Sequence, residues 1–86
     1  MNQSTNETEL LDKRKKKLLC DLKSVRHRLH EVALCLQRPG ALTREQYCAF
    51  ADEHNALVIR KGNIERCLYQ EFRMTDKQIN KELTDF

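Results

Sequence analysis

The 86-residue sequence contains no tryptophan, two glycines and one proline, and only 6% of its residues are aromatic. A β-sandwich or a loop-rich fold needs many more turn-forming residues than this. The sequence is instead rich in Leu, Lys, Arg, Glu and Gln, a composition typical of long helices and coiled coils. A chain of this length forms one small domain, which buries a small fraction of its surface and has little core to support a catalytic pocket. We therefore expect an all-α protein that is not an enzyme.

Sequence signatures of catalysis and of metal binding are also missing. The chain has no glycine-rich phosphate loop and no nucleophile elbow. Its four cysteines form no Cys-x-x-Cys pair, which disfavours zinc ribbons and thioredoxin-like sites. Cys20, His27 and His30 share one helical face, but they supply three ligands where a structural zinc site uses four. We predict no catalytic residue, no cofactor and no metal.

Long hydrophobic runs are absent as well. No apolar run approaches the roughly 18 residues of a membrane span, and the polar first residues lack the apolar centre of a signal peptide. We therefore expect an intracellular, cytoplasmic chain without a membrane span. Reduced cysteines are the expectation for such a chain, and disulfides between facing cysteines of a helical hairpin are the alternative.

Positive charge is concentrated in the first half of the chain. The net charge is +3, and residues 1–43 hold nine Lys or Arg against five Asp or Glu. A basic set accounts for most of this excess: Lys13, Arg14, Lys15, Lys16, Lys17, Lys23, Arg26 and Arg28. Such a set can act as a nuclear-localisation signal or contact phosphates, which makes the nucleus an alternative location and nucleic acid an alternative partner. The simpler interpretation is a solvated helix face on a coiled coil.

Apolar residues in the first half of the chain recur mostly at alternating spacings of four and three, the heptad pattern of a coiled coil. The residues of this seam are Leu11, Leu18, Leu22, Val25, Leu29, Val32 and Leu36. We predict a helix over about 9–37, preceded by a disordered polar tail over 1–8. Proline disfavours helical backbone in the residue before it and glycine permits a reversal, so Pro39 and Gly40 predict a turn over 38–43.

The second helix has a clear start signal. Thr43 is a good N-cap, and Gln46 three residues later completes a capping box. Apolar residues then follow at mostly helical spacing, and the short turn makes the two helices antiparallel neighbours. The residues expected to pair with the first seam are Tyr47, Phe50, Leu57, Ile64 and Leu68. We predict a helix over about 44–73 and an antiparallel helical hairpin.

Two positions compete for the end of this helix. Gly62 weakens its interior, since glycine costs about 1 kcal/mol relative to alanine there. Thr75 and Gln78 repeat the capping-box pattern, which would start a third helix over about 76–85. No glycine or proline stop precedes them, so we slightly favour a continuous or kinked helix. In either case residues 9–86 form one helical domain.

The segment 47–58 resembles two families of helical proteins. The positions that resemble the middle helix of the bivalent Mical/EHBP Rab-binding domain (bMERB) are Tyr47, Phe50, Ala51, Glu53, Asn55, Leu57 and Val58. Those that are similar to the occludin/elongation-factor homology domain are Tyr47, Ala51, Asp52, Glu53, Asn55, Leu57, Lys61 and Gly62. Both families are elongated antiparallel helical modules that bind other proteins. The resemblance therefore implies protein binding, and the first family implies a small GTPase as partner.

Apolar residues outside the seams indicate a second contact surface. Leu19 and Leu34 lie off the first seam, and Ile59 and Tyr69 lie off the second, so we expect them to remain exposed after the hairpin forms. The full set of candidate interface residues is Leu19, Leu34, Tyr47, Phe50, Asp52, Glu53, Asn55, Val58, Ile59, Tyr69 and Phe72. We predict a small coiled-coil adaptor, scaffold or subunit that binds a partner protein or self-associates into an oligomer. A basic nucleic-acid-binding or nuclear protein is the alternative.

Overall fold

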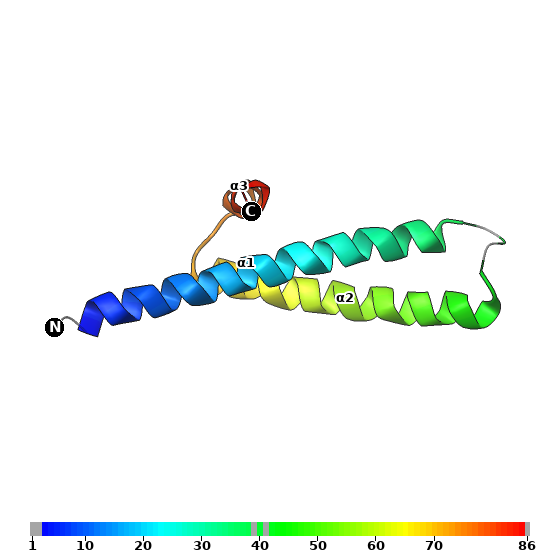
Figure 1. Ribbon diagram of the computed structural model, residues 1–86, viewed down its shortest axis with the longest axis horizontal. Coiled ribbons are helices and arrows are strands. Elements are labelled where there is room, and N and C mark those ends of the chain that lie inside the picture. Colours follow the sequence, from blue (N-terminus) through cyan, green and yellow to red (C-terminus); the bar gives the residue numbers. More distant parts are fainter. Residues whose placement is uncertain (1–2, 39, 41, 86) are drawn as a thin grey trace.

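The computed structural model describes residues 3–38, 40 and 42–85, and within these ranges it contains three helices and no strand. They are α1 (Gln3–Leu36), α2 (Arg44–Glu71) and α3 (Asp76–Thr84). α1 and α2 lie side by side and antiparallel, and the short α3 crosses the pair (Figure 1). The molecule is a rod with extents of 62 × 21 × 19 Å. The predicted all-α helical hairpin is confirmed.

α1 begins earlier than the sequence pattern suggested. It starts at Gln3 and not near residue 9, so most of the segment 1–8 that we expected to be a disordered tail is helical. Residues 1 and 2 lie outside the described part of the chain. The reason is that extending an existing helix fixes one residue per hydrogen bond gained, whereas a new helix must first be nucleated. The first turns of α1 extend past the end of α2 (Figure 1).

The start of α2 matches its sequence signal. The Thr43 hydroxyl accepts a hydrogen bond from the Gln46 backbone N–H at 3.1 Å, and the Gln46 side chain accepts one from the Thr43 N–H at 3.0 Å. The predicted capping box is therefore present. It satisfies two of the backbone donors that every helix start leaves without partners.

α2 and α3 are separate helices, so the continuous helix that we slightly favoured is wrong. α2 runs through Gly62 without a break and ends at Glu71. Arg73 then adopts a left-handed backbone conformation with φ of 50°, although most residues other than glycine avoid it. The Met74 N–H donates to the Leu68 carbonyl at 3.1 Å, and Thr75 caps α3 with a second capping box. The chain thus turns without the glycine or proline stop that we had required.

The main core lies where α3 crosses the hairpin. One cluster joins buried residues of all three helices and of the connection before α3: Leu19, Leu22, Val25, Ile64, Leu68, Met74, Ile79 and Leu83. Leu19 is only 1% exposed, so its assignment to an exposed interface is wrong. The cause is α3, which covers a face of α1 next to the seam. A two-helix hairpin alone would have left this face open.

The ends of the predicted seams are less buried than their centre. Leu22, Val25 and Val32 are buried, whereas Leu11 is exposed. Arg14, three residues further along α1, already pairs with Glu71, the last residue of α2. Tyr47 at the opposite end is exposed too. The seam therefore holds the hairpin together mainly through its middle turns.

Candidate protein-interaction groove

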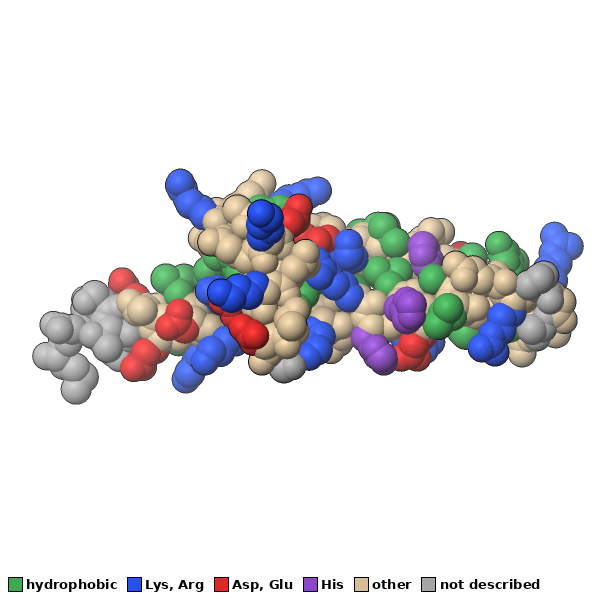
Figure 2. All heavy atoms as spheres, turned by 90° about the horizontal axis from the view of Figure 1, so that it is seen from above, with side chains coloured by type: hydrophobic (Ala, Val, Ile, Leu, Met, Phe, Trp, Pro, Cys, Tyr) green, Lys and Arg blue, Asp and Glu red, His purple; other side chains and the backbone are tan. Residues whose placement is uncertain are grey.

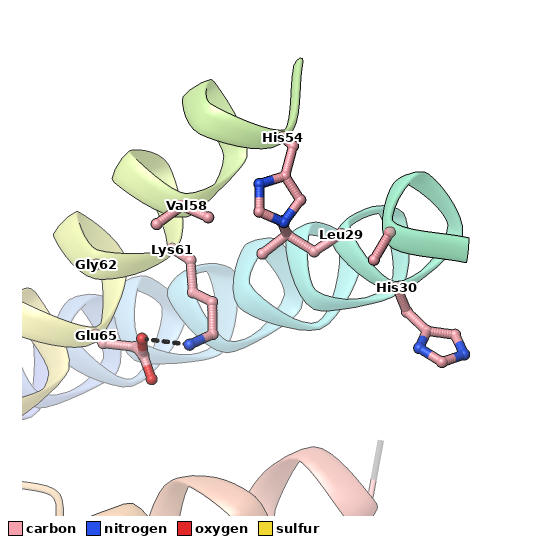
Figure 3. Close-up of a pocket in the computed structure, with 8 residues that line it drawn as sticks. Leu29, His30, His54, Val58, Lys61, Gly62 and Glu65 are labelled. Atoms are coloured by element: carbon pink, nitrogen blue, oxygen red, sulfur yellow. Dashed lines mark ion pairs between the residues drawn. The ribbon is translucent and has the colours of Figure 1, made fainter. Parts of the chain in front are cut away.

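An open groove runs between α1 and α2 next to α3. Its volume is about 510 Å³, and its lining residues are Leu29, His30, Ala33, His54, Val58, Lys61, Gly62 and Glu65. Figure 3 shows His54 projecting from α2 toward Leu29 of α1, while His30 points away from α2. Seen from the α3 side in Figure 2, hydrophobic and histidine side chains lie on the half of the hairpin that α3 leaves uncovered.

A polar network separates the groove from the α3 contact. The Arg26 guanidinium donates to Asn80 of α3 at 2.8 Å and to Glu65 of α2 at 3.3 Å. Lys61 contacts the other oxygen of Glu65 at 3.1 Å. Arg26 thus links all three helices beside Glu65, which also lines the groove. Hydrogen bonds to charged groups stabilise such junctions by roughly 1.5–3 kcal/mol when they are partly desolvated.

The lining of the groove carries one charged side chain of each sign. Lys61 is the single Lys or Arg among the lining residues, and His30 and His54 add polar imidazole rings. Glu65 is the single carboxylate among the lining residues, and Lys61 and Arg26 both bind it. The surface therefore offers apolar contacts from Leu29 and its neighbours inside a polar border.

Gly62 opens one side of the groove. It lies in the interior of α2, and a Cβ added there would meet no atom within 4 Å. Packing inside this chain therefore gives no reason for a glycine at this position. Its effect is to leave the α2 backbone accessible from the groove, where Figure 3 places it.

We expect Gly62→Ala to stabilise the free chain. Alanine is favoured over glycine inside a helix by about 0.5–1 kcal/mol, and the added methyl group meets nothing. For a domain of this size, 1 kcal/mol corresponds to a rise in Tm of roughly 4–8 °C. Thermal denaturation followed by circular dichroism measures the shift. An unchanged or lower Tm would mean that the methyl group does meet other atoms.

The structure leaves some of the candidate interface residues exposed and packs others against the hairpin. Among the described residues, the large apolar candidates that remain exposed are Leu34, Tyr47, Val58, Ile59 and Tyr69. Val58, 48% exposed, lines the groove, whereas Ile59, 65% exposed, does not. Asp52 and Asn55 are exposed, Phe50 and Glu53 are half-buried, and Phe72 packs against the core. The candidates therefore do not form one continuous surface.

Glu53 has a role within the hairpin. Both of its carboxylate oxygens accept from the Arg28 guanidinium, at 2.5 and 3.0 Å, which joins α1 to α2. The Arg28 hydrogen bond holds the pKa of Glu53 below its ordinary value and raises that of Arg28. A bidentate pair of this kind fixes the register of the helices.

The basic set also falls into two groups, arginines that pair with carboxylates of α2 and lysines that are mostly exposed. Arg14 pairs with Glu71 at 2.8 Å, and Arg26 and Arg28 bind carboxylates of α2 as described above. Lys13, Lys16, Lys17 and Lys23 are exposed and Lys15 is half-buried. The arginines thus hold the hairpin together, and the exposed lysines make the first half of α1 basic.

Tyr69 connects α2 to the start of α3. Its hydroxyl donates to the Asp76 carboxylate. This hydrogen bond, with some loss of hydration and the nearby negative charge, raises the pKa of Tyr69 from 10.0 to about 12. The exposed Tyr69 therefore takes part in the contact between two helices of the same chain.

The Tyr69 contact predicts a change at high pH. Because the folded chain holds the phenol proton more tightly than the unfolded chain does, the free energy of unfolding falls as the pH rises from about 10 to about 12. Absorbance at 295 nm should show a phenol ionising near pH 12 in the folded chain, and Tyr69→Phe should remove that step. If the Phe variant has the same titration curve above pH 11, the contact is absent.

Several groove residues were not predicted from the sequence. Leu29 was assigned to the seam, and Gly62 was noted as a weak point of the helix and as part of the occludin/elongation-factor resemblance. His30 was weighed only as a metal ligand, and Ala33 was not considered. A glycine inside a helix that continues past it was the one available signal. The other residues become neighbours only once the hairpin register and the position of α3 are known.

The described residues show no other kind of site. Cys20, Cys35, Cys48 and Cys67 are free thiols. In the described part of the chain, no group of three or more His, Cys, Asp or Glu could hold a metal ion. None of the helices, over the residues described, is long and apolar enough to cross a membrane.

Comparisons of the chain with protein-family models, with curated proteins and with solved structures find no match.

Proposed function

We propose that this chain is a non-enzymatic protein-interaction module, an adaptor or subunit that binds partner proteins through its helical faces in the cytoplasm or nucleus. The groove beside α3 is the observation that carries the proposal, because it exposes apolar side chains of both long helices along an open surface. Exposed apolar surface with polar surroundings is typical of protein contact sites. A helical hairpin also has a thin core, which a partner helix can complete.

The proposal is tested by two measurements on the full chain in reductant. Light scattering after size exclusion, over a concentration series, detects a second copy as partner. Quantitative affinity purification compares the wild type with a Tyr47→Ser, Val58→Ser variant and with Lys77→Ser, an exposed control on α3. We expect an oligomer, or a protein that the double variant loses and the control retains. A monomer that enriches no protein overturns the proposal.

Small GTPases are the first partner class that we propose to test, because of the resemblance over 47–58. Within that segment Asn55 and Val58 are exposed, whereas Leu57 packs against the core and Glu53 is held by Arg28. A Rab-class GTPase should therefore bind through Asn55 and Val58. Binding to the GTP-loaded form that Asn55→Ala weakens supports this class, and equal binding of the GDP-loaded form argues against it.

Nucleic-acid binding is the second candidate function, and the exposed lysines Lys13, Lys16 and Lys17 favour it. Phosphate contacts release counterions, so each contact adds about 0.9 to the slope of log affinity against log salt on duplex DNA. Fluorescence anisotropy with a labelled duplex measures this slope. Three lysine contacts predict a slope near −3 that Lys16→Ala reduces by about one, and absence of binding at low salt excludes this function.

A further inference from the structure

We propose that two copies of this chain form a dimer by exchanging α3, so that α3 of each copy packs on α1 of the other. In this dimer α2 and α3 of each copy form one continuous helix, and residues 73–75 between them act as the hinge. The inference rests on the proposed function, to which it adds a second copy as the partner and α3 as the contact. It follows from the backbone of the hinge, from the apolar pattern that crosses the hinge and from the contacts of α3.

The hinge is short and contains a strained residue. Phe72, which caps α2, still lies in the right-handed helical region, whereas Arg73 has a φ of 50°. Most residues other than glycine avoid this left-handed conformation, because it brings Cβ too close to the following carbonyl oxygen. Thr75 is extended and caps α3. A change of backbone angles within the hinge alone therefore converts the turn into helix and relieves the strain at Arg73.

The apolar pattern of α2 continues through the hinge. Ile64, Leu68 and Phe72 are four residues apart, and Ile79 and Leu83 follow at spacings of seven and four. These spacings place the five side chains on one face of a continuous helix. Neither glycine nor proline occurs between residues 64 and 85. The sequence is thus compatible both with the turn and with a helix that runs through it.

The contacts of α3 can form within one copy or between two. Ile79 and Leu83 lie in one buried cluster with Leu19 of α1, and Arg26 of α1 donates to Asn80 of α3. α3 crosses the long helices and is joined to α2 by the hinge segment (Figure 1). An exchanged α3 makes these same contacts with the second copy, which is why exchange of an identical element is a low-cost route to a dimer.

Two local features oppose the exchange. The capping box of Thr75 and Gln78 exists only while α3 begins as a separate helix. The hydrogen bond from the Met74 N–H to the Leu68 carbonyl holds the turn, and the Met74 side chain is buried in the core cluster. The balance between these features and the strain at Arg73 decides which form is favoured. Because a dimer contains two hinges, a change in the hinge acts twice on the dissociation constant.

The direct test uses the full wild-type chain in reductant. Equal amounts of ¹³C-labelled and unlabelled chain are mixed in urea and refolded together at the highest concentration of the light-scattering series. Isotope-filtered nuclear Overhauser spectra then detect only the contacts between copies. We expect contacts from the Ile79 and Leu83 methyl groups of one copy to the Leu19 and Leu22 methyl groups of the other.

Two hinge variants should shift the dimer in opposite directions. Arg73→Gly removes the strain of the turn and weakens a helix through the hinge, so we expect the dissociation constant of the dimer to rise at least about a hundredfold. Thr75→Ala removes the capping hydroxyl and favours helix, so we expect the dissociation constant to fall at least about tenfold. Light scattering over the concentration series measures both changes.

Two matched variants control for effects that do not act through the hinge. Gln70→Gly places a glycine at an exposed position in the last turn of α2, which is helical in both forms. Thr75→Ser keeps a hydroxyl that caps α3. We expect both variants to keep the dissociation constant of the wild type.

A monomer in both the wild type and Thr75→Ala would overturn the inference, and so would a dimer without contacts between α3 of one copy and α1 of the other. A dimer that Tyr47→Ser, Val58→Ser dissociates and the hinge variants leave unchanged would place the contact in the groove and overturn it too. If the chain is a monomer but affinity purification yields a protein that the double variant loses, the inference fails and the proposed function stands. If the monomer enriches no protein, both are wrong.

Discussion

Leu22→Ala should lower the free energy of unfolding by about 2–5 kcal/mol, the range for truncating a buried leucine. Leu22 is fully buried in the cluster that joins the three helices, so the change removes apolar contacts and leaves a cavity. A domain of 86 residues has a total stability of roughly 4–13 kcal/mol. The variant therefore loses a large share of it. Urea denaturation followed by circular dichroism measures the change.

Leu34→Ala is the matched control for Leu22→Ala. Both residues lie on α1, but Leu34 is 46% exposed and belongs to no buried cluster. We expect its effect to stay within about 0.5 kcal/mol. Similar losses in the two variants would mean that the buried cluster is not the main source of stability. A larger loss for Leu34→Ala would place a contact on the exposed side of α1.

The hairpin could be predicted because its signals are local. Pro39 and Gly40 mark the turn, and Thr43 with Gln46 marks the restart by a mechanism that uses neighbouring residues only. The heptad spacing predicted Leu22 as a core residue in the same way. Each of these features depends on residues that are close in the sequence.

The arrangement of α3 could not be predicted, because it depends on contacts between distant parts of the chain. The pattern at Thr75 and Gln78 gave the correct start of α3, but it does not say whether the preceding helix ends. Arg73 in a left-handed conformation ends the run, and the burial of Met74 and its hydrogen bond to the Leu68 carbonyl offset the cost of that conformation. The prediction that Leu19 is exposed was wrong for the same reason, because α3 covers it through contacts between distant parts of the chain.

The groove follows from this arrangement. α3 has nine residues, so it covers part of the hairpin, and the rest of the surface stays open. The residue types along the groove are ordinary for a helix surface, and no spacing pattern singles them out. What distinguishes them is their position beside α3, which the sequence alone does not give. A site of this kind is recognised only after the helices have been placed.

Ile79→Asp should detach α3 from the hairpin. Ile79 is fully buried in the core cluster, and a carboxylate there would have no counter-charge among the hydrophobic residues around it. Isolated helices shorter than about 12–15 residues are marginal in water, so the nine residues of α3 should unfold once they lose this contact. Hydrogen exchange with mass spectrometry should show loss of protection over 76–84.

The same variant tests how far the hairpin depends on α3. Leu22 of α1 and Leu68 of α2 belong to the same buried cluster and remain after α3 detaches. The Arg28–Glu53 pair joins α1 to α2 away from α3. We therefore expect the middle turns of α1 and α2 to keep their protection while Leu19 becomes exposed. Lys81→Ala, an exposed change on α3, should leave both regions unchanged. If residues 76–84 stay protected, Ile79 does not hold α3 in place; if all protection is lost together, the hairpin requires α3 in order to fold.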